Sequence, residues 1–460
     1  MARQSRGSIT VEILIAFSVF ALSAGAILLI EAGVNDAAEA TLRHADMLAI
    51  ADYALAKAMS SEADIAERVE LNGTTYVTTM TQSALTACMS SFEASVSRER
   101  YMFERRVYKA DVEESMRLGG DCLYRSYSDL GIPHDYGSVA GEEGSAIDTL
   151  DSHIYIGTDK PPYLRIHEDV EYVAFTNGFS LHARPAALDV VHYPGGEEGM
   201  RTIIFAALET STGQLAVIDA SDASEPLLVA TSTLAGVVPS GSAPGGHRIF
   251  YYDGRVFIST LETAGPELHV FSVADPEHPT EIGAGYSINI TLNDFSIQDD
   301  RLYAATARDT GEIAVYQISD TGTLAELTML RTDLPGSQDG ESIAVIADML
   351  YLGRASNTAG PELYTYRIDD ESFTQLGSAE IPSVSITGVR VVGDRAYLAA
   401  TPSGVSTRRL EIYDVSNPSS MERIDSRSIP GLAPRGIDVA PGGVYAVSTR
   451  DPILRLLPSN

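Results

Sequence analysis

The hydrophobic positions of the chain follow three patterns, one after another. Residues 8–30 are apolar apart from hydroxyls, Gly25 and one carboxylate, Glu12. Residues 36–70 place their larger apolar side chains at the spacing of one helix face, among alanines and acidic residues. From about residue 145 onward, short apolar runs alternate with polar turns. These patterns predict a long N-terminal helix followed by a mainly β region.

A three-residue apolar–aromatic–apolar step recurs seven times in the β region. Successive aromatic residues are separated by 46 to 52 positions, and they are Tyr155, Phe205, Phe257, Tyr303, Tyr351, Tyr397 and Tyr445. The segment Thr263–Leu268 also recurs unchanged at Thr358–Leu363, which indicates duplication. A repeat of this length suits four-stranded propeller blades. The expected fold class is therefore mainly β, a seven-bladed β-propeller preceded by a long N-terminal α-helix of transmembrane or pilin type and a small α+β stalk.

About ten residues after the aromatic strand comes a third strand with alternating hydrophobicity, as at residues 312–317 and 362–367. In the sharpest copy it reads Leu-Glu-Ile-Tyr-Asp-Val-Ser-Asn-Pro over Leu410–Pro418, and Ile218–Asp222 is a degenerate copy. These units resemble the LVIVD-type repeat. The last unit ends before its outer strand, so we expect a strand lying before Asp148 to complete it and close the ring.

The start of the chain joins a basic leader to the hydrophobic run. Arg3 and Arg6 precede Gly7, and the apolar residues begin at Ser8. A helix made from residues 8–30 would be roughly 35 Å long, enough to cross a bilayer. A carboxylate inside such a run costs a few kcal/mol and normally marks a functional contact. Glu12 therefore calls for an explanation that a simple anchor does not supply.

The segment from Gly7, Gly-Ser-Ile-Thr-Val-Glu-Ile-Leu-Ile-Ala, resembles the cleavage motif of type IV prepilins. The resemblance implies that a prepilin peptidase cuts between Gly7 and Ser8 and methylates the new amine. It also implies that Glu12 pairs with the N-terminal ammonium of a neighbouring subunit in the filament core. Ser8 stands where major pilins carry a large apolar residue, which favours a minor pilin or pseudopilin. A cleaved secretory signal and a plain membrane anchor stay open as alternatives.

Composition narrows the range of partners. The chain has 63 acidic and 32 basic residues, a net charge of -31, and such a field repels nucleic acid and anionic lipid headgroups. Its two cysteines, Cys88 and Cys122, are too few for a multi-cysteine zinc site. In an exported protein we expect them to form a disulfide, the alternative being two unrelated buried thiols.

The remaining residues, 71–144, give the weakest pattern, although residues 74–80 and 101–111 are β-like. We divide the chain into a leader peptide (1–7), a hydrophobic then amphipathic pilin helix (8–70), a small pilin-like stalk (71–144) and a propeller of about seven repeats (145–460).

No catalytic, metal or cofactor motif stands out in the sequence. The nine histidines are scattered, and nucleotide-binding glycine patterns and Asp-x-Asp-x-Asp calcium loops are missing. The chain has no tryptophan, which quinone-dependent propellers use as docking residues. We therefore expect no enzyme activity, no metal and no cofactor. An enzyme whose carboxylates come together from several loops would escape this reasoning.

Together these features predict a surface-displayed structural or adhesive subunit, a minor pilin or pseudopilin of a type IV pilus-like filament. Its expected partners are other pilin subunits through the N-terminal helix, the prepilin peptidase and pilus assembly machinery, the membrane before assembly, and a surface protein or glycan bound by the propeller. It would start in the inner membrane of a bacterium and end at the cell surface or in an extracellular filament. The alternative is a membrane-anchored or secreted binding propeller, or less favourably a propeller enzyme, that enters no filament.

Overall fold

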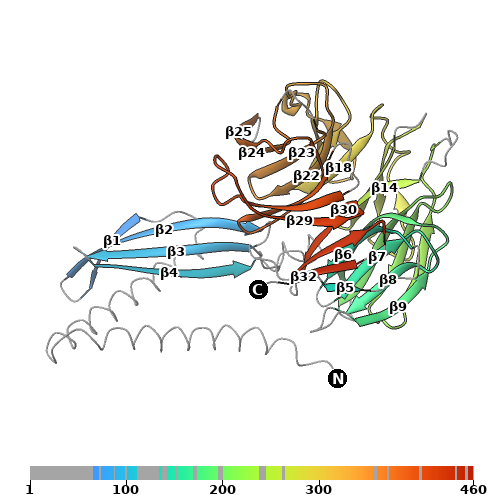
Figure 1. Cartoon of the computed structure of the whole chain (residues 1–460), viewed down its shortest axis with the longest axis horizontal. Coiled ribbons are helices and arrows are strands. Elements are labelled where there is room, and N and C mark those ends of the chain that lie inside the picture. Colours follow the sequence, from blue (N-terminus) through green and yellow to red (C-terminus); the bar gives the residue numbers. More distant parts are fainter. Residues whose placement is uncertain are drawn as a thin grey trace. The chain divides into compact units, whose positions relative to one another are not determined.

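The computed structural model describes residues 66–71, 74–86, 89–98, 101–110, 134–136, 142–150, 153–168, 174–194, 200–237, 245–261, 265–356, 360–369, 372–402, 407–440, 443–450 and 454–458 (Figure 1). Within these ranges the regular elements are β-strands and one short 3₁₀ helix, Thr328–Leu330. The chain divides into two compact units, residues 1–83 with 90–109 and residues 84–89 with 110–460.

The first unit contains a four-stranded sheet in the order β1-β2-β3-β4. Its strands are β1 Ala66–Leu71, β2 Thr74–Thr86, β3 Met89–Arg98 and β4 Tyr101–Ala110. The β character predicted for residues 74–80 and 101–111 is thereby confirmed. β1 and β2 pair antiparallel, with Leu71 opposite Thr74, and the residues between them are Asn72 and Gly73. Asn-Gly is the strongest short hairpin signal in a sequence.

The expected fold class is wrong in its helical part. Residues 66–70, expected to end the long helix, belong to β1, and the stalk expected to be α+β contributes strands to the described ranges. No helix in the part of the chain that the structure describes is long and apolar enough to cross a membrane. Residues 8–65 of the expected helix lie outside that part. The Asn-Gly hairpin explains the error at residues 66–70, because it pairs them with β2.

The second unit is a propeller of radially arranged four-stranded sheets. Six sheets are blades built from four consecutive strands. The first three are β6 Gly144–Leu150, β7 His153–Thr158, β8 Tyr163–Glu168, β9 Ala174–Ser180; β10 Pro185–Pro194, β11 Met200–Leu208, β12 Leu215–Asp219, β13 Leu227–Ser232; and β14 Gly246–Tyr252, β15 Arg255–Thr260, β16 Leu268–Ser272, β17 Thr280–Glu281. The next three are β18 Leu292–Gln298, β19 Arg301–Thr306, β20 Ile313–Ile318, β21 Leu324–Glu326; β22 Gly340–Ile346, β23 Met349–Arg354, β24 Leu363–Asp369, β25 Ser372–Ala379; and β26 Val384–Val392, β27 Arg395–Pro402, β28 Thr407–Asp414, β29 Glu422–Pro430.

The remaining sheet is composite and closes the ring. It joins β30 Leu432–Ala440, β31 Gly443–Ser448 and β32 Leu454–Pro458 to β5 His134–Tyr136, which precedes all six blades in the chain. β5 pairs antiparallel with β32, Tyr136 opposite Leu454, and Figure 1 shows the two strands side by side. The expectation that an earlier strand completes the last unit is confirmed. The expectation of seven alike blades is corrected to six self-contained blades and this composite sheet.

Two-residue turns connect the first and second strands in the third to sixth blades. Between β14 and β15, Tyr252 lies opposite Arg255, and the turn residues Asp253 and Gly254 have φ values of 49° and 70°. Such left-handed pairs form the hairpin turns whose twist matches that of the strands. One of the polar turns predicted between the apolar runs is therefore present here.

The core of the propeller lies between neighbouring sheets. Between the third and fourth blades, Phe257 and Val270 of one sheet share a buried cluster with Phe295 and Leu302 of the next. A comparable cluster joins the first blade, through Ile154, to the composite sheet. Face-to-face packing of this kind fixes the innermost strands around a common axis, where the candidate site lies.

Candidate functional site

The site residues predicted from the sequence lie outside the described part of the chain. They are the processing pair Gly7 and Ser8, the assembly residue Glu12, and the cysteines Cys88 and Cys122. Processing, assembly and the disulfide therefore stay predictions. The structure instead brings together residues that the sequence did not single out.

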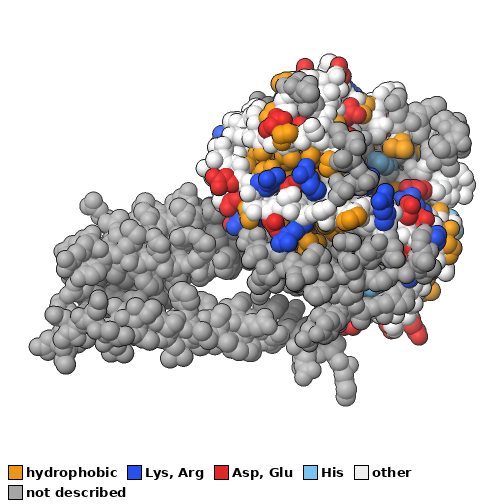
Figure 2. Space-filling view, in the orientation of Figure 1, with side chains coloured by type: hydrophobic (Ala, Val, Ile, Leu, Met, Phe, Trp, Pro, Cys, Tyr) orange, Lys and Arg blue, Asp and Glu red, His pale blue; other side chains and the backbone are white. Residues whose placement is uncertain are grey.

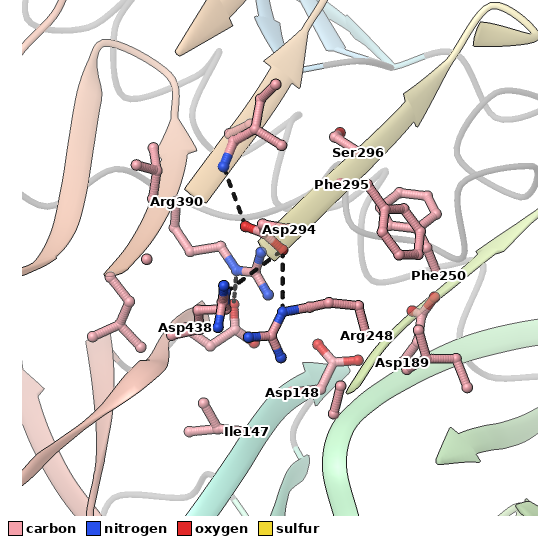
Figure 3. A pocket seen from close by; sticks show the side chains of 18 of the residues that line it. Ile147, Asp148, Asp189, Arg248, Phe250, Asp294, Phe295, Ser296, Arg390 and Asp438 are labelled. Atoms are coloured by element: carbon pink, nitrogen blue, oxygen red, sulfur yellow. Dashed lines mark hydrogen bonds and ion pairs between the residues drawn. The ribbon is translucent and has the colours of Figure 1, made fainter. Parts of the chain in front are cut away.

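A cavity of about 230 Å³ lies among the innermost strands of all the propeller sheets (Figure 3). Its lining comes from β6, β10, β14, β18, β22, β26 and β30. It includes four carboxylates and three guanidinium groups, namely Asp148, Asp189, Asp294, Asp438, Arg248, Arg390 and Arg435. The ionised lining would carry one net negative charge.

One ring of cavity residues follows directly from the repeat. In each sheet, the residue paired with the repeat aromatic lies on the innermost strand and lines the cavity. Around the ring these residues are Asp148, Asp189, Phe250, Ser296, Ala344, Arg390 and Asp438. Three carboxylates thus occupy adjacent positions, on β30, β6 and β10, and Phe250 comes next after them.

All three carboxylates connect neighbouring sheets, and two of them use both oxygens to do so or to bind their own strand. Asp148 accepts hydrogen bonds from the backbone N–H of Thr149 at 3.0 Å and from that of Val190, on the next blade, at 2.5 Å. Asp438 accepts a hydrogen bond from the Thr149 hydroxyl at 2.7 Å, and its other oxygen lies 3.5 Å from Nε of Arg390. Their lone pairs are engaged by protein groups, which is how buried carboxylates are normally accommodated.

Asp189 accepts one hydrogen bond, and unlike Asp438 it has no ion pair within the described residues. Its Oδ2 accepts a hydrogen bond from the backbone N–H of Tyr251 on the next blade. Burial raises the pKa of Asp189 to about 7, the nearby Asp438 carboxylate adds to the rise, and the Tyr251 N–H and Arg390 oppose it. A carboxyl group with this pKa changes its charge near neutrality.

A second group of charges crosses the channel. Asp294 lies 3.5 Å from Nε of Arg248 and 3.8 Å from Nε of Arg435, and it accepts the backbone N–H of Ile343 at 3.2 Å (Figure 3). Burial raises the pKa of Asp294 and lowers that of Arg248 to about 10. Both guanidinium groups are therefore matched to one carboxylate.

Arg435 reaches this position from a strained backbone. Its φ is 58°, a left-handed value that side chains rarely adopt. From β30 it donates hydrogen bonds across the channel to the carbonyl of Asn293 on β18 and, at 2.9 Å, to that of Glu341 on β22. The strain is consistent with a side chain that ties together sheets far apart in the ring.

Aromatic and aliphatic side chains complete the cavity. The rings of Phe250 and Phe295 lie 6.4 Å apart, and Ile297, Val345 and Val391 also line the wall. The Arg390 side chain is 48% exposed, so the cavity reaches solvent beside it. The whole arrangement suits a small molecule that combines a charged group with a hydrocarbon part.

The cavity lacks the geometry of a metal site. Among the residues that the structure describes, no group of three or more His, Cys, Asp or Glu side chains could hold a metal ion. The channel residues escaped the sequence reasoning because each is a single charge on a different strand. For Asp148, Asp189, Arg390 and Asp438, the position opposite a repeat aromatic was the available signal.

The turns of the outer strands explain the repeat motif. In the sharpest copy, Asp414 Oδ1 accepts hydrogen bonds from the backbone N–H of Ser416 at 2.9 Å and from its hydroxyl at 2.5 Å. In the degenerate copy, Asp219 Oδ1 accepts the same pair from Ser221 at 2.9 and 2.6 Å. The Asp-x-Ser step therefore forms the same local turn in both units.

The fold and these turns define a β-propeller protein. A family model described as LVIVD repeat matches residues 386–426, from within β26 to within β29. The protein is thus a β-propeller that contains an LVIVD repeat. No curated protein sequence matches the chain.

Several solved structures are similar to this chain at low identity. The computationally designed Ika8 protein is 12% identical, with 70% of this chain and 97% of that one covered and a TM-score of 0.44. A protein from Lactobacillus plantarum is 15% identical, with 69% and 96% covered and a TM-score of 0.43. The periplasmic gluconolactonase PpgL of Pseudomonas aeruginosa is 11% identical, with 64% and 87% covered and a TM-score of 0.47.

Proposed function

We propose that this protein is a surface-displayed recognition subunit, a minor pilin or pseudopilin whose propeller presents a binding surface. The observation that carries the proposal is Glu12, the single charge within the 23 residues that follow Gly7. A carboxylate buried in an apolar assembly is strongly disfavoured without a partner. The ammonium created by cleavage after Gly7 supplies that partner in a filament, whereas a signal peptide or plain anchor has no use for it.

The propeller supports a recognition role by its construction. β5 closes the ring, and the sheets are tied together at their inner edges by the hydrogen bonds of Asp148, Asp189 and Asp294. A closed ring with packed interfaces holds its surface loops on a rigid frame, which suits binding. The proposal assigns the chain no catalytic step and no cofactor.

The face of the propeller visible in Figure 2 is mixed in charge. Figure 2 shows acidic and basic side chains interspersed with small groups of hydrophobic ones on the visible face. The large exposed apolar side chains are spread over several elements, with Leu227 and Leu228 on β13, Met329 in the 3₁₀ helix and Ile424 on β29. Such a surface fits a protein that faces water and recognises a surface protein or a glycan.

Replacing Glu12 tests the proposal in the native cells. We expect the Glu12→Ala protein to be cut after Gly7 but to be lost from sheared filaments, while the matched Glu31→Ala variant assembles as the wild type does. Mass spectrometry of the membrane and sheared fractions reports both steps. If Glu12→Ala assembles normally, or if neither protein is ever found with other pilin subunits, a membrane-anchored or secreted binding propeller replaces this proposal.

A further inference from the structure

One carboxylate in the channel is left over after the structural contacts are assigned. Asp148 uses both oxygens on backbone N–H groups, Asp438 faces Thr149 and Arg390, and Asp294 faces two arginines. Asp189 uses only Oδ2, and none of the described residues donates to its Oδ1. Asp189 is partly exposed and lines the cavity, so this oxygen is accessible to a ligand.

The surroundings of Asp189 indicate the chemistry of that ligand. The next ring position is Phe250, which precedes Tyr251, the residue whose N–H binds Asp189. Both residues line the cavity, and Figure 3 draws them on the same side of it. A carboxylate next to an aromatic face attracts an ammonium group, through the charge of the one and the ring quadrupole of the other.

The arginines of the cavity do not create a competing anion site. Arg248 and Arg435 lie against Asp294, and Arg390 lies against Asp438. With four carboxylates to three guanidinium groups, the lining has one unmatched negative charge. A cation is the ligand that would neutralise it.

We propose that the central channel binds a primary ammonium group on a short unbranched alkyl chain, with the ammonium at Asp189 and the alkyl chain against Phe250. The cavity volume of about 230 Å³ accommodates an alkylamine of a few carbons. The mixed wall matches both parts of such a molecule. This site goes beyond the recognition role proposed above and stands whether or not the chain enters a filament.

Titration calorimetry on the full-length protein in non-ionic detergent tests the site with n-butylammonium chloride. We expect saturable binding of this probe, and at least about 10-fold weaker binding of 1-butanol and butyrate, which lack the cation. Nα-acetyl-lysine amide in the same assay separates a lysine side chain from a free amine as the source of the ammonium group. Tighter binding of butyrate than of butylammonium would overturn the proposal.

Variants then locate the binding. We expect Asp189→Asn to weaken butylammonium binding by at least about 10-fold and Phe250→Leu to weaken it several-fold. The amide oxygen of Asp189→Asn can still accept the Tyr251 N–H, so the fold is kept. The control Asp425→Asn removes a carboxylate that pairs with Arg427 on β29, and its affinity should stay within about 2-fold of the wild type. Unchanged affinity in Asp189→Asn refutes the site.

The wild-type protein alone offers a second readout. Asp189 must be ionised to bind the cation, so affinity should fall about 10-fold between pH 8 and pH 6. The charged and titratable groups facing Asp189 are Asp148 on β6, Arg248 and Tyr251 on β14, Arg390 on β26 and Asp438 on β30. Affinity that is flat over this range contradicts the assignment to Asp189, even if the variants fail to fold.

Discussion

A buried ion pair outside the channel gives the sharpest stability prediction. Arg354 on β23 and Glu312, the residue before β20, both have fully buried side chains, and Arg354 Nη2 lies 3.1 Å from Glu312 Oε1. Arg354 also donates to the carbonyls of Pro335 at 3.1 Å and Gln338 at 3.3 Å, and Glu312 Oε2 accepts the N–H of Leu334 at 3.0 Å. The pair thus holds the segment that leads into the fifth blade.

Replacing Arg354 with methionine should destabilise the propeller by about 3–5 kcal/mol, because it leaves Glu312 buried without its cation and two carbonyls without their donor. In the double variant Glu312→Gln/Arg354→Met no charge is stranded. Its loss of stability should be smaller than the sum of the single losses by at least about 2 kcal/mol.

Urea unfolding followed by circular dichroism and tyrosine fluorescence measures these differences. The control is Arg367→Met, which removes a half-exposed arginine that lies 3.4 Å from Asp369 and should change stability by less than about 1 kcal/mol. Equal effects of Arg354→Met and Arg367→Met would refute the reasoning, as would additive losses in the double variant.

The pH dependence of Arg354→Met has a definite sign. Burial raises the pKa of Glu312 above its ordinary value of 4.5 already in the wild type, and loss of the arginine raises it further. A carboxyl group whose pKa is raised by folding stabilises the protein at a pH below its unfolded-state pKa. This contribution is lost as the pH rises through its folded-state pKa. The free energy of unfolding of the variant should therefore be closest to that of the wild type below about pH 4.5, and the difference should be largest at neutral pH.

Three further predictions concern the ring and its channel. A chain that begins at residue 142 lacks β5 and exposes the edge of β32. It should have a lower melting temperature and aggregate more than a chain that begins at residue 130. Identical melting curves would show that β5 is dispensable. Because the pKa of Asp189 is raised from 3.8 to about 7, this group stabilises the fold at a pH below 3.8. That stabilisation is lost as the pH rises through about 7. Urea titrations should accordingly show the wild type losing stability relative to Asp189→Asn between pH 4 and pH 8, whereas parallel profiles would contradict that pKa. In Gly340→Ala the new Cβ would lie 2.6 Å from the Glu312 carbonyl oxygen, so the free energy of unfolding should fall by about 1–3 kcal/mol in urea unfolding. A decrease below about 0.5 kcal/mol would mean that the backbone at the start of β22 shifts easily.

The repeat made the propeller predictable from the sequence. All seven repeat aromatics lie on the second strands of their sheets, as in β15 with Phe257 and β27 with Tyr397. The alternating segment at 312–317 likewise became β20, Ile313–Ile318. These predictions succeeded because a blade buries its second and third strands on both faces, and that burial imposes a visible hydrophobic pattern.

Features set by ring closure were harder to foresee. Asp148 and Asp189 come together only because β6 and β10 meet at the axis, and neither residue has a local motif. β5 has three residues, too few for a periodic signal, although the missing outer strand of the last unit indicated that something must pair with β32. At residues 66–71 the spacing of apolar residues predicted a helix, whereas the following Asn-Gly sequence is typical of a β-hairpin. The structure shows these residues paired with β2.

The central claim is that a recognition propeller is attached to a pilin-like, processed N-terminus. Intact mass measurement and N-terminal sequencing of the protein from its native cells test that claim most directly. Our account predicts a chain that starts at Ser8, with an added methyl group on its amine. A start within residues 21–32, or an intact Met1 start, would contradict it and leave a secreted or membrane-anchored propeller.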